Sequence, residues 1–246
     1  MCSSDLIVSG GHTILYEVAA AGAAETLAAT LLRYRKIGQT RDDAAGEAYD
    51  KVAKLLALGY PGGPVIDRLA PQDAAKGRSR GEGIDFGPTK IKGNSYDFSF
   101  SGIKTAVLYY VRAHAELQPE IEARRQALRE GKRKAEELVS LCGEQTLRLI
   151  GSFQRRVVTE LLNRTVRAAE EFGAQTILVS GGVAANSELR RAFEGEAQRR
   201  DFSVYFPSRE LSTDNAAMIA AAAYPKLLAG QLADCDLNAE AVLPLA

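Results

Sequence analysis

Two short apolar runs, each ending in Ser-Gly-Gly, are the clearest feature of the hydrophobic pattern. The first run, Leu6 to Ser9, is followed by Gly10-Gly11, and the second, Ile177 to Ser180, by Gly181-Gly182. Apolar runs of this length that end at glycine are typical of buried strands. A rough two-residue alternation from Thr13 to Val18 follows the first glycine pair. We therefore expect a strand, a tight turn and a second strand near the start of the chain.

Apolar residues at helical spacing predict two long helices. Thr40 to Leu58 carries an apolar face, and Thr40 with Asp43 three residues later resembles a capping box at its start. Tyr60 to Pro64 should end this helix, because two prolines around two glycines form a stiff turn. The longest expected helix runs from about Glu144 to Phe172, with a core stripe of Leu147, Ile150, Phe153, Val157, Leu161 and Val166.

Shorter elements complete a pattern of mixed strands and helices. The alternation in two segments predicts strands, and the segment 117–140 is dense in charges of both signs, which is typical of an exposed helix. The expected strands are Ser95 to Ser101 and Phe202 to Phe206, and the expected helices are Val65 to Ala70, Ile103 to His114, Leu117 to Ser140, one from about Glu188, and Ala216 to Tyr224.

Each Ser-Gly-Gly has two interpretations. Backbone N–H groups in such a turn can hold an anion, and paired glycines let a ligand approach the backbone closely. A tight connection between elements is the simpler alternative, and it is favoured for the copy at Ser180 when that copy is taken alone. The second copy at Ser9 shifts the balance towards a nucleotide cleft with one loop in each wall. His12, directly after the first turn, is more typical of a structural hydrogen-bonding residue than of a base or ligand.

Two carboxylates also have open interpretations. Asp50 lies on a polar helix face, where it either pairs with Lys54 at i,i+4 or points at a ligand hydroxyl. Asp214 precedes the helix expected from Ala216, where it is a good N-cap by type and equally an oxygen ligand for a metal. A single carboxylate does not make a metal site.

Composition narrows the class of protein. The chain of 246 residues is long enough for one large domain or two small ones, and its 46% hydrophobic residues argue against global disorder. Lys plus Arg and Asp plus Glu both number 31, so an RNA contact would need a local patch, for which the basic loop Lys76 to Gly93 is the best candidate. The cysteines Cys2, Cys142 and Cys235 are widely spaced, which fits a reducing cytoplasm, and no apolar run is long enough for a membrane span.

Five motifs follow one another in a recognisable order. They are IVSGGHT at Ile7 to Thr13, DDAAGEAYDKVAKLLALGYPGGP at Asp42 to Pro64, SFSGIKTA at Ser99 to Ala106, SGGVAANSELR at Ser180 to Arg190 and STDNAAMIA at Ser212 to Ala220. In this order they resemble the TsaD family of bacterial tRNA adenosine threonylcarbamoyltransferases, formerly described as glycoproteases. The resemblance extends from Leu6 to about Gly230. It implies an actin-like ATPase fold of two RNase H-like lobes with the nucleotide between them.

The resemblance also implies a reaction and a set of site residues. The threonylcarbamoyl group of threonylcarbamoyl-AMP would move to N6 of the adenosine at position 37 in tRNAs that read ANN codons. TsaB and TsaE would be partners in the cytoplasm, with no membrane. By match to the family motifs, Ile7, Val8, Ser9, Gly10 and Gly11 would hold the acyl-phosphate, Asp50, Gly63 and Asp67 the ribose, and Asn186 the adenine, while Asp214 would be one ligand of a single Fe²⁺. No general base is evident.

The chain departs from the family pattern on its N-terminal side. The family begins with a lobe that holds another phosphate loop and a His-x-x-x-His metal pair, whereas the two histidines here, His12 and His114, are far apart. We therefore expect residues 1–5 to be an arbitrary start, 6–211 the second lobe with a helical insertion at 114–140, and 212–246 a segment returning to the first lobe. Such a fragment would be inactive, because positioning of the adenylate between two walls is lost when one wall is absent. It would also be poorly soluble, because no strand precedes Leu6 and an apolar lobe interface would be exposed.

Other functions on the same fold remain as alternatives. An ATP-dependent kinase would need a complete pair of phosphate loops. A non-catalytic scaffold of the TsaB type would not be expected to keep Asp50, Gly63, Asn186 and Asp214 together. An endopeptidase would need a nucleophile and a base, and no such constellation is evident.

Overall fold

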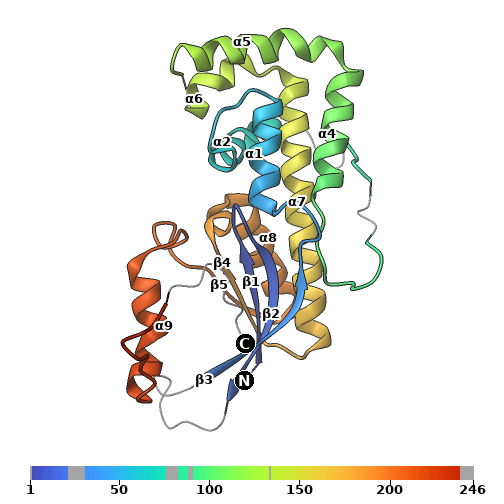
Figure 1. The fold of residues 1–246 in the computed structure, drawn as a ribbon. Helices are drawn as coiled ribbons and strands as arrows, with labels where there is room; N and C mark the ends of the chain where they lie inside the picture. The colour runs from blue at the N-terminus through green and yellow to red at the C-terminus, as the bar shows by residue number, and fades with distance from the viewer. Residues whose placement is uncertain (1, 22–30, 76–82, 88–90, 133, 239–246) are drawn as a thin grey trace.

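A mixed five-stranded sheet is the base of the computed structural model, which describes residues 2–21, 31–75, 83–87, 91–132 and 134–238 (Figure 1). The strand order is β3-β2-β1-β4-β5. Strand β2 is antiparallel to both β1 and β3, whereas β4 runs parallel to β1 and β5 runs parallel to β4. This arrangement confirms the α/β class and agrees with the RNase H-like lobe that the resemblance implied. The strands are β1 (Cys2–Val8), β2 (Thr13–Ala21), β3 (Leu31–Gln39), β4 (Thr176–Ser180) and β5 (Ser203–Tyr205).

Strand β1 is the central strand of the described sheet. Asp5 lies opposite Tyr16 of β2 on one side and Leu178 of β4 on the other. The strand includes residues 2–5, so the arbitrary start that we expected there is part of the sheet. The first strand is therefore paired along both edges, because the hairpin and the parallel strand β4 supply its partners from later in the chain.

Helices α7 (Glu144–Glu171) and α8 (Ser187–Arg200) cover one face of this sheet (Figure 1). Along β1, the alternate residues Ser4, Leu6 and Val8 are fully buried, whereas the residues between them are only partly buried. This two-residue period is the expected signature of a strand with one covered face. The core stripe expected for the longest helix is confirmed, since its apolar residues are buried.

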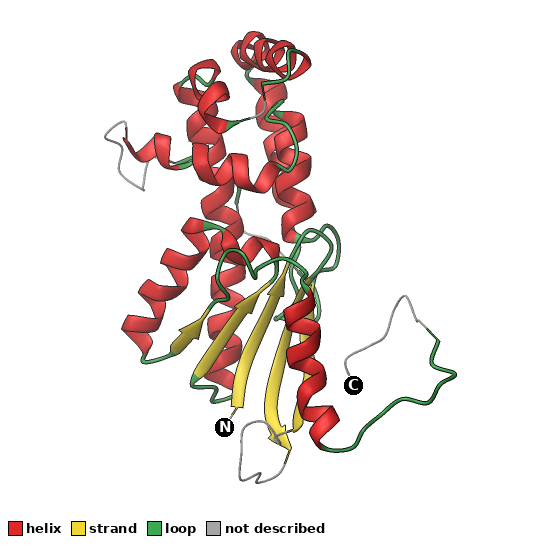
Figure 2. Ribbon diagram, turned by 90° about the vertical axis from the view of Figure 1, so that its left-hand side faces the viewer, coloured by secondary structure: helices red, strands yellow, loops and turns green. Residues whose placement is uncertain are grey.

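Helices α1 to α6 pack at the far end of the sheet, beside the continuing length of α7 (Figure 2). The described part of the chain holds no helix that is long and apolar enough to cross a membrane. The additional helices are α1 (Ala45–Leu55), α2 (Gly62–Leu69), α3 (Pro71–Ala75), α4 (Ser101–Ala113), α5 (Gln118–Arg129) and α6 (Ala135–Leu138), with short 3₁₀ turns at Ala115–Leu117, Val139–Leu141 and Gly182–Ala185.

The capping box expected from Thr40 and Asp43 is wrong, because α1 begins later, at Ala45. Thr40 Oγ1 donates to the backbone oxygen of Asp43 at 2.8 Å. The Asp43 carboxylate accepts from Lys51 Nζ at 2.7 Å and Lys104 Nζ at 3.1 Å. These bonds use both side chains in the segment before the helix, so neither one caps it.

The strand expected from Ser95 to Ser101 is also wrong, apart from an isolated bridge between Phe98 and Thr40. The Asp42 carboxylate accepts from the backbone N–H groups of Phe100 at 2.8 Å and Ser101 at 3.1 Å. It therefore draws this segment into the N-terminal turn of α4. Burial alone raises the pKa of Asp42, but these bonds and those from the Ser99 and Ser101 hydroxyls outweigh it and hold the pKa below its usual value.

The single exposed helix expected from Leu117 to Ser140 is divided, and one side of it is buried. Helix α5 ends before Gly131, which has φ of 87°. The Arg124 side chain is fully buried, and it donates to the backbone oxygens of Leu56 at 2.8 Å and Leu141 at 2.7 Å. Arg124 therefore joins α5 to two other segments of the chain. The mixed charges of this stretch of sequence did not indicate that one of its arginines is buried.

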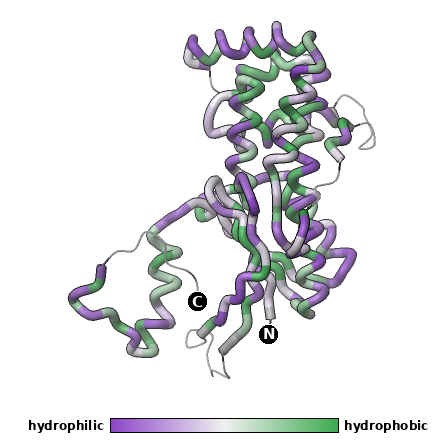
Figure 3. The backbone as a smooth tube through the Cα atoms, turned by 45° about the vertical axis from the view of Figure 1, so that its right-hand side comes forward, coloured by the Kyte–Doolittle hydropathy of each residue, from purple (hydrophilic) through white to green (hydrophobic). Residues whose placement is uncertain are grey.

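Helix α9 (Ala216–Leu228) stands apart from the sheet in Figures 1 and 3. It has no buried residue, and its largely apolar chain is shown in green and pale colours in Figure 3. Its N-cap is Asn215, whose Oδ1 accepts from Met218 N at 3.0 Å, so the interpretation of Asp214 as the cap is wrong. The expected helix is confirmed, and it continues past Tyr224.

Candidate functional site

The two Ser-Gly-Gly segments meet at one edge of the sheet. Ile7 of β1 lies opposite Ser180 of β4 in parallel register. Gly181 has φ of 92°, and a Cβ there would lie 2.4 Å from the backbone oxygen of Val8. The two glycine turns are therefore neighbours in a single wall, because they follow adjacent strands, and the expectation of one loop in each wall is wrong. Ligands of α/β proteins commonly bind at such carboxyl ends of strands.

The first turn is organised by the Ser9 side chain. Its Oγ accepts from the backbone N–H groups of Gly11 at 3.3 Å and His12 at 3.0 Å. Ser9 N donates to the backbone oxygen of His12 at 2.7 Å, which closes the turn. Beside Gly10 and Gly11 a Cβ would meet no atom within 4 Å, so their outer surface is open to a ligand. Of the expected acyl-phosphate residues, Val8 has a buried side chain and can offer only its backbone.

The N-terminus of α1 is bound to this turn. Gly46 N donates to Ser9 O at 3.0 Å, and Ala45 N donates to Thr13 Oγ1 at 2.9 Å. These two bonds satisfy N–H groups that the first turn of a helix leaves without intrahelical partners. A Cβ on Gly46 would lie 2.6 Å from Ser9 O, so only glycine allows the helix to approach this closely.

Asp50 and Gly63, two of the expected ribose residues, lie where α1 meets α2. Asp50 Oδ1 accepts from Gly62 N at 2.7 Å and so binds the first turn of α2. The sequence had left open a pair with Lys54 or a contact to a ligand hydroxyl, and this bond to the backbone is neither. Gly62 is closely packed, since a Cβ there would lie 2.4 Å from the Cβ of Ala53. Gly63 is open, with no atom within 4 Å of a Cβ. Helix α2 begins directly after Pro61, earlier than the expected start at Val65.

Asp67 and Asn186 are brought together through Gln154 of α7. Asn186 Nδ2 donates to Gln154 Oε1 at 2.9 Å, and Gln154 Nε2 lies 3.5 Å from Asp67 Oδ1. Asp67 also accepts from Ser187 N at 3.0 Å and Ser187 Oγ at 2.8 Å. Asn186 Oδ1 caps α8 by accepting from Leu189 N at 2.9 Å. Both expected residues therefore stabilise the N-terminus of α8, and their contacts to ribose and adenine stay predictions.

A buried tyrosine lies beside this cluster. Tyr49 is 1% exposed, and its hydroxyl has no hydrogen-bond partner among the described residues. Burial raises the pKa of Tyr49 well above its usual value, and the negative charges of Asp67 and Glu188 raise it further. The Tyr49 side chain is thus a buried polar group near the carboxylate of Asp67.

Asp214 and the basic loop do not join the cluster through any described contact. Asp214 is exposed just before α9. Among the described residues, no group of three or more His, Cys, Asp or Glu side chains could hold a metal ion. The donors present here thus do not form an iron site by themselves. Most of the basic patch expected in Lys76 to Gly93, including Arg78 and Arg80, lies outside the described residues.

Gln154 and Tyr49 were missed by the sequence reasoning. Gln154 directly follows Phe153 and lies four residues after Ile150, so it is a polar residue on the stripe assigned to the core. A polar side chain on a buried helix face needs a hydrogen-bond partner, which is the signal that could have identified it. Tyr49 directly precedes Asp50 on the apolar face of α1, and its type gave no comparable signal.

Comparisons with known proteins identify the family of this chain. The family model for TsaD, tRNA N6-adenosine threonylcarbamoyltransferase, matches residues 5–221. A protein of that description from Koribacter versatilis is 53% identical over 252 residues, covering 98% of this chain and 63% of the relative. Those from Syntrophotalea carbinolica and Thermodesulfovibrio yellowstonii are 45% and 42% identical, covering 98% of this chain and 59% and 61% of the relatives. The chain thus spans about three fifths of the length of these relatives. The chain belongs to the TsaD family.

Proposed function

We propose that this chain carries one side of the adenylate-binding site of a tRNA N6-adenosine threonylcarbamoyltransferase. We call this side, formed by the two Ser-Gly-Gly turns and the N-terminus of α1, the adenylate wall. The observation that carries the proposal is the meeting of the two Ser-Gly-Gly turns, through Ile7 and Ser180, beside the N-terminus of α1. Open glycine backbone next to helix N-termini suits a phosphate or an acyl-phosphate. The family membership supplies the reaction class, since the relatives are named for it.

The proposed donor is threonylcarbamoyl-AMP, and the acceptor is N6 of adenosine 37 in tRNAs that read ANN codons. The N6 nitrogen forms a bond to the carbamoyl carbon, the bond from that carbon to the phosphate oxygen breaks, and AMP leaves with the electron pair. A proton is lost from N6. Ile7 to Gly11 would hold the acyl-phosphate end, and Asp50, Gly63 and Asp67 would orient the ribose. Orientation of this kind lowers the barrier without a covalent intermediate.

Three further features belong to the proposal. Asn186 would define the adenine side of the site, next to the N-terminus of α8. Fe²⁺ would polarise the carbamoyl oxygen when bound, with Asp214 as one ligand, but the described residues do not complete its coordination. TsaB and TsaE would be partner proteins, and the cytoplasm would be the location.

The proposal is tested first by binding and then by transfer. Isothermal titration of the chain with AMP should give one site per chain, and the absence of binding would overturn the adenylate wall. For transfer, the chain is incubated with unmodified tRNA and threonylcarbamoyl-AMP that carries isotope-labelled threonine, with TsaB and TsaE present. Labelled threonylcarbamoyladenosine in the tRNA digest, measured by mass spectrometry, supports the reaction and would overturn the expectation that a chain without the first lobe is inactive. Consumption of ATP with a phosphorylated product and no modified nucleoside would instead favour a kinase of the same fold.

A further inference from the structure

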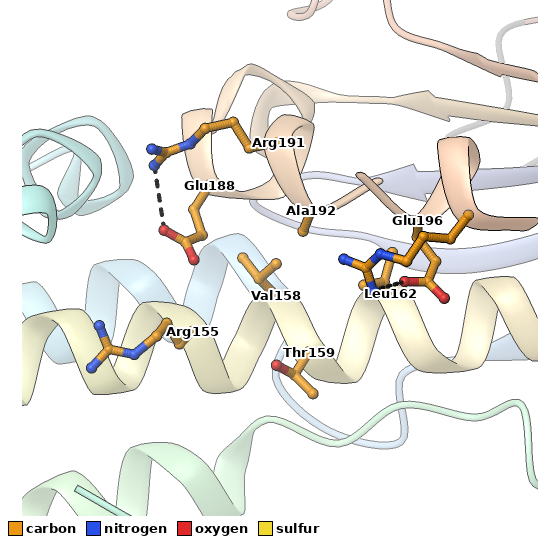
Figure 4. A pocket seen from close by; sticks show the side chains of 9 residues that line it. Arg155, Val158, Thr159, Leu162, Glu188, Arg191, Ala192 and Glu196 are labelled. Carbon is orange, nitrogen blue, oxygen red and sulfur yellow. Dashed lines mark hydrogen bonds and ion pairs between the residues drawn. The ribbon is translucent and has the colours of Figure 1, made fainter. Parts of the chain in front are cut away.

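A groove with a volume of about 260 Å³ runs between α7 and α8 (Figure 4). Its lining includes three arginines, two of which lie at one end in Figure 4, and an apolar middle formed by Val158 and Leu162. None of these residues was singled out from the sequence, and none belongs to the adenylate wall. The arginines are Arg155, Arg191 and Arg199.

Two of these arginines have exposed guanidinium groups in weak local pairs. Arg191 is paired with Glu188 at 3.4 Å and Arg199 with Glu196 at 2.9 Å, and their side chains are 58% and 74% exposed. Exposed ion pairs of this kind contribute about 0–1 kcal/mol, so a stronger anion can replace the carboxylate at little cost. Glu196 also pairs with Arg200, which leaves that carboxylate neutralised when Arg199 turns to another partner.

Arg155 is the fixed cation on the α7 side of the groove, at the end where Arg191 also lies (Figure 4). Its terminal nitrogens donate to Asp73 Oδ2 at 3.3 and 3.4 Å and to Ser152 Oγ at 3.2 Å, and its side chain is 26% exposed. The groove therefore has one rigid cation and two adaptable ones around an apolar floor. Spaced cations along an apolar groove match the alternation of phosphate and ribose in a nucleic-acid strand.

The position of the groove relates it to the adenylate wall. Glu188 lines the groove and directly follows Ser187, whose N–H and hydroxyl bind Asp67. The groove thus starts beside the N-terminus of α8 and follows that helix away from the site. The chain has equal numbers of basic and acidic residues, 31 of each, so attraction of a polyanion has to come from a local arrangement of this kind.

We propose that the α7–α8 groove binds backbone phosphates of the tRNA substrate, outside the nucleotide that reacts. This inference rests on the proposed function, because it takes tRNA as the polyanion. Arg191 and Arg199 exchange their carboxylate partners for phosphate oxygens, and Arg155 fixes the position of the tRNA backbone along the groove. Phosphate contacts of this type position a nucleic acid without reading its sequence.

The test compares two double variants of the chain. Arg191→Gln/Arg199→Gln removes the adaptable cations of the groove, and Arg125→Gln/Arg129→Gln is the matched control. Arg125 and Arg129 are exposed arginines of α5 that pair with Glu122 at 3.1 and 3.9 Å, so the control removes the same charge from a distant helix. Binding of unmodified tRNA is measured by fluorescence anisotropy across a series of salt concentrations, and binding of AMP by calorimetry.

The groove variant should bind tRNA roughly tenfold or more weakly at low salt, with the control unchanged. Its slope of log K against log salt should fall by about 1.4–1.8, since each phosphate contact contributes about 0.7–0.9. AMP affinity should stay the same in both variants. Equal tRNA affinity in the groove variant and the control, or no tRNA binding by the chain at all, would overturn the groove assignment. If neither variant binds AMP, the result contradicts the adenylate wall and leaves the groove proposal standing. The two proposals can therefore be disproved by different measurements.

Discussion

The side chains of Asn186 and Gln154 form a buried hydrogen bond of 2.9 Å that joins the N-terminus of α8 to the middle of α7. Asn186 is 7% exposed, and Gln154 is fully buried. The second polar atom of Asn186 is also used, as the cap that accepts from Leu189 N at 2.9 Å. This residue therefore supports the geometry of the proposed adenine side from within the protein.

Asn186→Ala should lower both stability and AMP affinity. The substitution removes a helix cap and leaves a buried Gln154 oxygen without its donor, which together cost about 1–3 kcal/mol. We expect AMP affinity to fall by a similar amount, because the N-terminus of α8 loses its fixed position. Urea unfolding measures the first effect, and calorimetry with AMP, at a temperature where the variant is folded, measures the second.

Asn215→Ala is the matched control for this prediction. Asn215 also caps a helix, since its Oδ1 accepts from Met218 N at 3.0 Å, but it is remote from Gln154 in the fold. The control should leave AMP affinity unchanged. Equal AMP affinity in Asn186→Ala and the unaltered chain would remove Asn186 from the site.

Gly181 and its neighbour Gly182 should respond very differently to alanine. A Cβ at Gly181 would lie 2.4 Å from Val8 O, and its φ of 92° is a conformation that costs a residue with a side chain about 1–3 kcal/mol. At Gly182 a Cβ would meet no atom within 4 Å. Gly181→Ala should therefore separate the ends of β1 and β4, lower the melting temperature and abolish AMP binding.

Gly182→Ala should keep the melting temperature, because its Cβ meets no protein atom within 4 Å. The pair is a sharp comparison because the two changes are identical in chemistry and adjacent in the chain. If both variants bind AMP as well as the unaltered chain does, the junction of the two Ser-Gly-Gly turns does not form the phosphate site.

The sequence was informative where local chemistry decides the structure. The strand at Ile177 and the long helix from Glu144 follow from apolar runs and their spacing, which act within a few residues. Strand β3 was missed because Leu31 to Gln39 alternates weakly and carries several basic residues. Its pairing with β2 supplies the hydrogen bonds that its own pattern did not indicate.

The candidate site was predictable in its members but not in its arrangement. Family motifs named Asp50 and Asp67, yet each carboxylate accepts from the N-terminus of another helix. Those partners, Gly62 and Ser187, are 12 and 120 residues away from them in the chain. The spacing of apolar and polar residues along the chain cannot indicate contacts between residues that lie this far apart in sequence. The segment from Ser95 to Ser101 failed for the same reason, because Asp42, far away in sequence, determines its conformation.

The chain should carry no stoichiometric iron or zinc after exposure to either metal and dialysis. Protein metal sites of this kind use three or more protein ligands, and the described residues supply no such group around Asp214. Elemental analysis of the purified chain measures the content. A ratio of one metal per chain that is lost in Asp214→Ala, but kept in Asp201→Ala, would show that further residues of this chain complete the coordination.

The pH dependence of stability should reveal Asp5 at the centre of the sheet. Burial raises the pKa of Asp5 from its usual 3.8 to about 6, and the hydrogen bond from Ser3 Oγ at 2.9 Å offsets only part of this effect. Between these two values the unfolded chain is ionised at Asp5 while the folded chain keeps the proton. The folded state then binds more protons, so this residue makes stability fall as pH rises from about 4 to about 6.

Asp5→Asn should remove this contribution. The variant should therefore be more stable than the unaltered chain at pH 7, where the full cost of ionising or protonating Asp5 is present, and similar to it at pH 4. Asp42→Asn is the control with the opposite sign: the pKa of Asp42 is held below its usual value, so it stabilises at neutral pH and loses that effect in acid. Urea unfolding from pH 4 to pH 8 measures the effect of Asp5, and extending the series to about pH 2 measures that of Asp42, whose stabilising effect is lost only below its usual pKa of 3.8. Parallel stability curves for the unaltered chain and Asp5→Asn would show that Asp5 titrates alike in the folded and unfolded states.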